Sequence, residues 1–277
     1  MWGQRCIEPA AAEKVKRIAK KLDNSAIGIT HEWQREYPNH TLAGAVVGFR
    51  LRDGQGGGGV ELALDKRLSA EDGKRVMLAD AGRRPIWPLA AESRLPSDGS
   101  NVFLTIDTLI QESLDIAVND AAAKYGAKWA TGVVMDPRTG DVLAMSSSPG
   151  FDPAQFSQTS ADNSTNRAVS LPFEPGSALK PVFAAAAVDA GVVNFRTVLF
   201  CENGEYDAIK GGRISDHGSR YGDLTVEDIV VHSSNIGMAK VGEKLGNKKQ
   251  FEIAKLFGFD ATTGIELPGE SAGILRP

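Results

Sequence analysis

The chain has 277 residues, of which 42% are hydrophobic and 24% charged, and its formal net charge is −4. This length and apolar content can bury one or two cores, which excludes a wholly disordered chain. The modest negative charge, without a basic cluster of the kind that marks an RNA or DNA surface, excludes nucleic acid as an expected partner.

The segment from Glu8 to Leu22 predicts an amphipathic helix with a face of lysine and arginine. We interpret that face as a solvated surface that binds nothing. No apolar run reaches the ~20 residues that a membrane span requires, and the N-terminus lacks the basic-then-apolar pattern of a signal peptide. The chain as given is therefore expected to contain no membrane segment.

Between residues 31 and 87, short β-like runs alternate with turns, and Pro-rich polar sequence follows through Pro96 and Ser97. Such a change in composition is typical of a domain boundary. We therefore predict one domain over residues 1–96 and a second over residues 97–277.

A glycine-rich run from Gly54 to Gly59 fits the dinucleotide-binding pattern G-x-G-x-x-G, with Asp80 about twenty residues further on. However, the segment from Val60 to Leu68 is too short for the crossover helix of such a fold, and no second strand follows where Asp80 would need one. We interpret the glycines as a loop.

In the second domain, Val102 to Ile106 predicts a strand and Thr108 to Tyr125 a long helix. Two further strands, Thr131 to Met135 and Asp141 to Ser146, are expected to form a hairpin around the turn residues 136–140. Mixed helices and strands of this kind indicate an α+β fold.

The spacing of Ser177 and Lys180 is the first candidate for chemistry. Pro175 and Gly176 signal a turn, and the alanine-rich run that follows favours a helix until Gly191. Residues three apart share one helix face, so Lys180 can act as the base that activates the Ser177 hydroxyl. The backbone N–H of Ser177 could stabilise an oxyanion. Alone, the same spacing also arises by chance, as a helix cap followed by a solvated lysine.

A second motif, Ser233-Ser234-Asn235, is expected on a connection between two helices. Thr225 to Asp228 resembles a capping box that starts a short helix, and a further helix is expected from Ile236 to Gly246. Side chains on such a connection can point into a cleft, although serine and asparagine are also common helix caps.

Other residue types offer weaker candidates. Asp216 and His217 could complete a serine, histidine and aspartate triad with Ser177, but a lone histidine in a loop is usually solvated. No histidine pair has the helical spacing of a zinc site, and Cys6 and Cys201 lack metal-like spacing. We expect no metal and two unpaired or buried thiols, and the sequence leaves a disulfide open.

The two motifs and the blocks around them resemble the class B penicillin-binding proteins, a family of peptidoglycan transpeptidases, and most of all its division-type members. The similar blocks cover nearly the whole chain in the order of the family. They are Tyr37 to Ala43, Asp80 to Ile86, Phe103 to Asp107, Val133 to Met145, Asn166 to Val169, Ser233 to Lys240 and Thr263 to Glu270.

The resemblance implies a transpeptidase domain of the penicillin-binding-protein/β-lactamase type, with an antiparallel sheet and a helical subdomain, preceded by part of a pedestal (dimerisation) domain. Ser177 would attack the D-Ala-D-Ala carbonyl of a stem peptide, and Lys180 would take its proton. Ser233 would pass a proton to the leaving D-alanine, and Asn235 would hold the substrate amide. Penicillin would acylate Ser177, and no cofactor is implied.

One departure from the family pattern is that no Lys-Thr-Gly triad follows Asn235 before Pro277, and Lys210-Gly211-Gly212 lies between the other motifs instead of after them. We therefore expect a fragment without the membrane anchor and without the Lys-Thr-Gly part. The alternatives are a catalytically incomplete scaffold or binding relative, and a β-lactam sensor or hydrolase.

By the same resemblance, the protein would act at the periplasmic face of the inner membrane. Its partners would be stem peptides, β-lactams, and division or elongation membrane proteins that include a glycosyltransferase.

Overall fold

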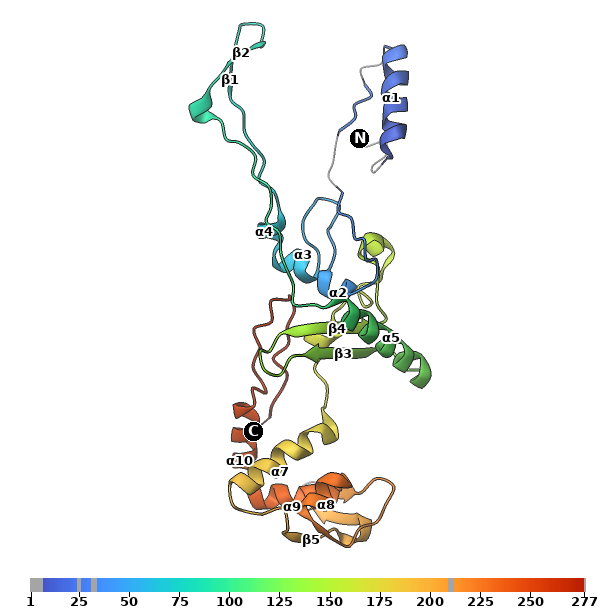
Figure 1. Cartoon of the computed structure of the whole chain (residues 1–277), viewed down its shortest axis with the longest axis vertical. Coiled ribbons are helices and arrows are strands. Elements are labelled where there is room, and N and C mark those ends of the chain that lie inside the picture. Colours follow the sequence, from blue (N-terminus) through green and yellow to red (C-terminus); the bar gives the residue numbers. More distant parts are fainter. Residues whose placement is uncertain (1–6, 24–25, 31–33, 209–211, 277) are drawn as a thin grey trace.

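The computed structural model describes residues 7–23, 26–30, 34–208 and 212–276 of an elongated molecule (Figure 1). One end carries the helix α1 (Pro9–Lys21) and the hairpin of β1 (Met77–Ala79) and β2 (Pro85–Pro88). The middle contains α5 (Thr108–Tyr125), β3 (Ala130–Met135) and β4 (Val142–Ser148). The other end contains α7 (Lys180–Asp189), α8 (Val226–Val231) and α9 (Asn235–Leu245).

Further elements lie within and between these regions. They are α2 (Gly44–Val47), α3 (Gly59–Ala63), α4 (Asp65–Leu68), α6 (Arg167–Ser170), α10 (Asn247–Leu256), β5 (Val198–Phe200), β6 (Glu205–Ala208), β7 (Gly212–Ser215) and β8 (Asp223–Thr225), with 3-10 turns η1 (Ala90–Glu92), η2 (Pro153–Gln158), η3 (Gly176–Leu179) and η4 (Glu202–Gly204). Within the described residues, every sheet has two strands, β1 with β2, β3 with β4, β5 with β8, and β6 with β7. The predicted α+β fold is confirmed.

The N-terminal region differs from its prediction, because helices stand where β-like runs were expected between residues 44 and 68. A buried carboxylate organises this part: Arg35 Nε, on a half-exposed side chain, lies 2.6 Å from the Glu61 carboxylate, which is only 3% exposed. Burial beside this carboxylate raises the pKa of Tyr37 to about 12. Long-range packing of this kind overrides the local preference of an apolar run for strand.

The glycine-rich run is a loop up to Gly58, as predicted, and Gly59 begins α3. Gly56 forms an isolated antiparallel bridge with Arg50, and side chains added at Gly57 or Gly58 would collide with the Phe49 ring. These glycines therefore permit close packing of the backbone on Phe49. No parallel sheet is present in the described part of the chain.

In the middle region, α5 packs against the antiparallel β3–β4 hairpin, which was predicted with its turn. The Asp107 carboxylate caps α5 by accepting from the N–H groups of Leu109 and Ile110. Gln111 is fully buried, and its amide bonds both backbone groups of Met145 on β4. The helix is thereby fixed to the hairpin.

The strand predicted from Val102 to Ile106 is wrong, because these residues form no ladder. Two isolated bonds tie the segment to β4, from Thr105 Oγ1 to the Val142 carbonyl and from Asp107 N to the Leu143 carbonyl. Phe103 is 94% exposed, and no strand in the described part of the chain pairs with the segment.

Two of the three apolar clusters among the described residues bear on the candidate site. One joins Ala43 and Val46 to Met145 and Val169, with Ile265 and Leu267 of the C-terminal segment beside them. The other joins α7, α8 and α9 through Ala187, Val226 and Val241. The second cluster determines where the candidate motifs lie, because α7 follows Ser177 and α9 begins at Asn235.

Three predictions concern single features. Cys201 is a buried free thiol, and burial raises its pKa, whereas Cys6 lies outside the described residues. Among the residues that the structure describes, no helix is long and apolar enough to span a bilayer, and no cluster of potential metal ligands occurs.

Candidate active site

Ser177 lies in η3, the 3-10 turn that leads directly into α7, and Lys180 is the first residue of that helix. The prediction that Ser177 opens a helix is thus met by a tighter turn, and Pro181 stands in the first helical turn as expected. Ser177 is exposed, and its hydroxyl has no hydrogen-bond partner among the described residues.

The turn at Ser233 ends α8 with an unusual residue. The N–H of Ser233 bonds the Val230 carbonyl and the N–H of Ser234 bonds the Ile229 carbonyl, which is the Schellman pattern. The left-handed position of this motif is usually glycine, yet here Ser233 has φ 55°. A serine that accepts this strain places a hydroxyl on the tight turn between α8 and α9, which is typical of functional sites.

Lys180 joins the two motifs, which are more than fifty residues apart in sequence. Its Nζ lies 3.0 Å from Ser233 Oγ, 2.6 Å from the Ser233 carbonyl oxygen and 2.7 Å from Asn235 Oδ1. The structure therefore brings together Lys180, Ser233 and Asn235. It places Ser177 on the preceding turn without a hydrogen bond to Lys180 in the described part of the chain.

Burial lowers the pKa of Lys180 below its usual 10.5, while the negative charge of Asp216 opposes that shift. An ammonium group has three N–H donors, which match the three contacts. A neutral amine has only two, so it must accept in one of them. Ser233 Oγ is the only one of the three partners that can donate, and the geometry thus permits a proton to move between Ser233 and Lys180.

Asn235 is oriented at both ends of its side-chain amide. Its Oδ1 accepts from Lys180, and its Nδ2 donates to the Ser215 carbonyl at 2.8 Å. Ser215 ends β7, so the β6–β7 hairpin supports the second motif. One N–H of the amide has no partner among the described residues and is free for a carbonyl oxygen.

Asp216 has a position that sequence reasoning missed. Its carboxylate accepts from Ser234 Oγ and from the N–H groups of Asn235, at 2.6 Å, and Ile236. Ser234 Oγ in turn accepts from the N–H of Gly237. Three of the four unpaired N–H groups of the first turn of α9 are thereby satisfied. Asp216 lies 18 residues before Ser234, the N-cap of α9, so no pattern of neighbouring residues indicates that it caps this helix.

The triad considered for Ser177, Asp216 and His217 does not form. The Asp216 carboxylate faces the start of α9, while His217 is exposed and makes no hydrogen bond with Asp216 or Ser177 in the described residues. The alternative Lys210-Gly211-Gly212 falls mostly outside the described residues.

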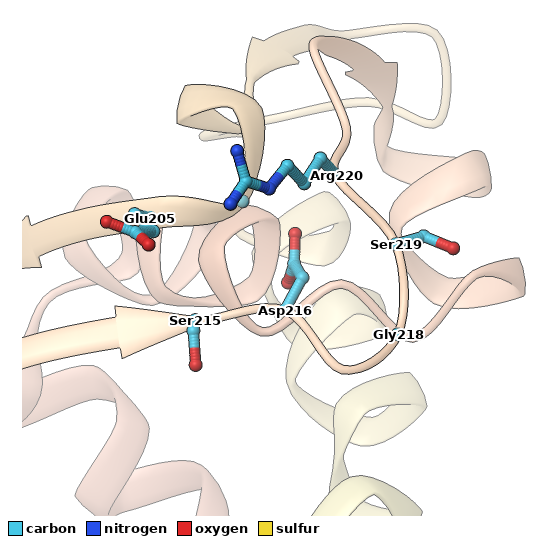
Figure 2. A pocket seen from close by; sticks show the side chains of 7 residues that line it. Glu205, Ser215, Asp216, Gly218, Ser219 and Arg220 are labelled. Carbon is cyan, nitrogen blue, oxygen red and sulfur yellow. The ribbon is translucent and has the colours of Figure 1, made fainter.

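An open pocket of about 280 Å³ adjoins these residues (Figure 2). Ser215 and Asp216 line it together with Gly204, Glu205 and the loop from Gly218 to Arg220. The side chain of Arg220 packs over Gly204, where an added Cβ would lie only 2.8 Å from Arg220 Cγ. The residues that hydrogen-bond Asn235, Ser215 and Asp216, therefore also line this pocket, whereas Lys180 does not line it.

Two family profiles match the chain. The penicillin binding protein transpeptidase domain matches residues 130–277, and the penicillin-binding protein dimerisation domain matches residues 4–104. The first profile contains all four candidate residues, and the second contains the N-terminal helices and the β1–β2 hairpin.

Relatives with curated names agree. The chain is 33% identical over its full length to the "Probable peptidoglycan D,D-transpeptidase PenA" of Neisseria meningitidis, of which it covers 46%. It is 32% identical, over 98% of its length, to the "Peptidoglycan D,D-transpeptidase FtsI" of Escherichia coli, of which it covers 44%. The chain thus spans less than half the length of these relatives.

Solved structures are similar in fold. A peptidoglycan synthetase from Bifidobacterium adolescentis has a TM-score of 0.76 at 31% identity, over 98% of this chain and 48% of that one. Penicillin binding protein 3 from Mycobacterium tuberculosis has a TM-score of 0.73 at 33% identity, over 88% and 51% respectively. The chain belongs to the class B penicillin-binding protein family.

Proposed function

We propose that this chain is the part of a peptidoglycan D,D-transpeptidase that carries the nucleophile, its base and the Ser-x-Asn motif. One observation carries the proposal: Lys180 follows Ser177 by one turn and hydrogen-bonds both Ser233 and Asn235. A serine nucleophile needs a base within reach. In structures without a ligand the hydrogen bond between nucleophile and base is often long, so its absence between Ser177 and Lys180 does not oppose the assignment.

In the proposed reaction, Ser177 Oγ attacks the carbonyl carbon of the D-Ala-D-Ala bond and gives its proton to the neutral Lys180 amine. Ser233 donates its own proton to the nitrogen of the leaving D-alanine and takes the proton from Lys180, at the 3.0 Å contact between the two groups. The peptide C–N bond breaks and an ester to Ser177 remains. An amine of a neighbouring stem peptide then attacks the ester carbonyl carbon, its proton passes through Lys180 to Ser177 Oγ, and the ester C–O bond breaks, which cross-links two strands and restores the Ser177 hydroxyl.

Asn235 would hold the substrate through its free N–H, and the backbone N–H of Ser177 would donate to the oxyanion. Penicillin would acylate Ser177 in place of the stem peptide. In support, structures of the similar Mycobacterium tuberculosis protein are described as complexes with aztreonam and with ampicillin.

The proposed context is the periplasmic face of the inner membrane, in division or elongation, beside membrane proteins that include a glycosyltransferase. The relatives named "Stage V sporulation protein D" and "Peptidoglycan D,D-transpeptidase FtsI" support a role in peptidoglycan synthesis. We also propose the division into a pedestal domain over residues 1–96 and a catalytic domain over residues 97–277. The dimerisation profile extends to residue 104, past the proposed boundary, and the transpeptidase profile begins at residue 130.

The test is covalent labelling of the native protein by a fluorescent penicillin. We expect Ser177→Ala to abolish the label, while Ser219→Ala, which changes an exposed serine on the neighbouring loop, keeps it. Labelling that persists in Ser177→Ala would overturn the assignment of the nucleophile. A folded protein that takes no label would favour the scaffold alternative, and a label lost rapidly by hydrolysis would favour a sensor or hydrolase.

A further inference from the structure

Lys240 is a mostly buried cation that the proposed chemistry does not use. It lies on α9, five residues after Asn235, and only 18% of its side chain is exposed. A separation of five residues rotates a side chain by about 140° around the helix axis, so the two residues lie on different faces of α9. An ammonium group that is removed from water needs partners for its three N–H groups. The partners of Lys240 therefore indicate which part of the chain it holds.

These partners belong to the segment that runs from β5 into β6. Lys240 Nζ donates to the Phe200 carbonyl oxygen at 2.7 Å and to the Glu202 carboxylate at 2.5 Å. It also lies 4.9 Å from the centre of the Tyr206 ring on β6, within the range of a cation–π interaction. The Tyr206 hydroxyl donates to Glu243, three residues further along α9, at 3.0 Å. Lys240 and Tyr206 thus fix this segment to α9.

The same segment contains a strained turn. In η4, Glu202 and Asn203 both have φ 51°, and Gly204 follows with φ 97°. The left-handed region is unfavourable for residues with a Cβ, so two of them in succession persist only where surrounding contacts hold them. The ion pair with Lys240 is such a contact. The Gly204 carbonyl in turn accepts from the N–H of Asp216 at 3.4 Å, so the turn that Lys240 holds is bonded directly to the residue that caps α9.

The β6–β7 hairpin connects this turn to the Ser-x-Asn motif. The hairpin ends at Ser215, whose carbonyl accepts from Asn235 Nδ2 at 2.8 Å (Figure 2). A two-stranded hairpin is marginally stable by itself, so its place depends on what anchors it. Tyr206 and Ile214 pack on an apolar cluster that includes Ile236 of α9, but apolar contact is non-directional and does not fix where the hairpin lies along the helix. The directional bonds of the β5–β6 segment supply that constraint.

We propose that Lys240 is a positioning residue for acylation, which acts through the β6–β7 hairpin on the Asn235 side chain. Its bonds to the β5–β6 segment set where Ser215 and Asp216 lie relative to the start of α9. The 2.7 Å contact between Asn235 Oδ1 and Lys180 therefore depends on Lys240. Lys240 has no hydrogen bond with Lys180 or Asn235 in the described part of the chain, so it takes no part in the chemistry itself. The inference rests on the proposed function for its kinetic test, but not for its structural test.

The kinetic test is a double-mutant cycle on the rate of acylation by a fluorescent penicillin. Lys240→Met removes the charge and should slow acylation about ten- to a hundredfold, because a small displacement of a positioned group is costly. In the Asn235→Ala background the same change should alter the rate less than about twofold, since the side chain that it positions is gone. The matched control is Lys244→Met, at an exposed lysine of the same helix, which should acylate like the native protein. Slowing by the same factor in both backgrounds would mean a general structural role and would overturn the proposal.

The structural test is amide hydrogen exchange, which needs no acylation. The Asn235 and Ile236 amides bond the Asp216 carboxylate, and their exchange should become at least about tenfold faster in Lys240→Met. Glu202→Gln removes only the ion pair, from a partly exposed side chain, and should give the same change to a lesser degree, so it decides the matter if Lys240→Met does not fold. Native exchange at both amides in a folded variant would overturn the proposal, whereas a native protein that takes no label would count against the proposed function alone.

Discussion

Asp216 gives the sharpest test of how the Ser-x-Asn motif is held. Replacing it with alanine removes the acceptor of the N–H groups of Asn235 and Ile236 and of the Ser234 hydroxyl. Ser234 Oγ still accepts from the N–H of Gly237, so α9 should form, but its first turn should be less stable. Asn235 would then lose the backbone position that fixes its contact with Lys180.

The magnitude follows from these bonds. A hydrogen bond to a charged group contributes about 1.5–3 kcal/mol, but the three donors share one carboxylate and their contributions are not additive. Loss of a helix cap costs up to about 2 kcal/mol. We therefore expect Asp216→Ala to lower the free energy of unfolding of this region by about 3 kcal/mol. Asp216→Asn retains an oxygen acceptor and should cost about 1 kcal/mol, mainly the lost attraction between charge and helix dipole.

Amide hydrogen exchange measures this effect at the residues concerned. Protection of the Asn235 and Ile236 amides should fall strongly in Asp216→Ala, and in a folded protein the exchange of Val118 in α5 should stay unchanged. Penicillin acylation should slow in parallel. Native protection at both amides, with native acylation, would refute the reasoning that Asp216 fixes the motif.

Four further predictions concern single side chains. The rate of acylation should rise as the pH passes the lowered pKa of Lys180. Asp216→Asn should move that rise to lower pH, because the charge of the Asp216 carboxylate raises the pKa of Lys180. A pH–rate profile that is unchanged or shifted to higher pH would contradict this interaction between Asp216 and Lys180. Ser233→Gly should raise the free energy of unfolding, measured in urea, by about 1 kcal/mol, because glycine adopts the left-handed conformation without strain. The same variant should slow penicillin acylation about a hundredfold. A lower free energy of unfolding would argue against strain at Ser233. Glu61→Gln should lower the free energy of unfolding by about 2–3 kcal/mol, because the charges of Arg35 and Arg50 then lose their partner. The control is Arg138→Gln, which removes an exposed ion pair and should leave the urea midpoint unchanged. Gly237→Ala should cost about 1–3 kcal/mol, since its Cβ would lie 2.5 Å from the buried Ile229 side chain, while Gly242→Ala in the same helix should be neutral or stabilising.

Local signals in the sequence located many of the elements. The capping box at Thr225 and Asp228 was predicted and is present, with both reciprocal hydrogen bonds. The long helix from Thr108 to Tyr125 has the predicted bounds, and the β3–β4 hairpin surrounds the predicted turn. These features depend on interactions between residues close together in the chain, so the local sequence is enough to predict them.

The errors occur where partners are distant. Residues 44–47 form a helix because Ala43 and Val46 pack on Met145 and Val169, far along the chain. The segment from Val102 to Ile106 has an apolar pattern but pairs with no strand among the described residues. For α1, the sequence predicted an amphipathic helix, and the structure contains that helix over Pro9–Lys21.

The two motifs, the helices that present them and the family to which they belong can all be recognised in the amino-acid sequence. Tertiary structure decided that Lys180 meets Ser233 and Asn235, that Ser233 takes a left-handed turn, and that Asp216 caps α9 instead of joining His217. The physical reason is range. Helix caps and turns depend on nearby residues, whereas contacts across fifty residues depend on how the apolar faces of α7, α8 and α9 pack together.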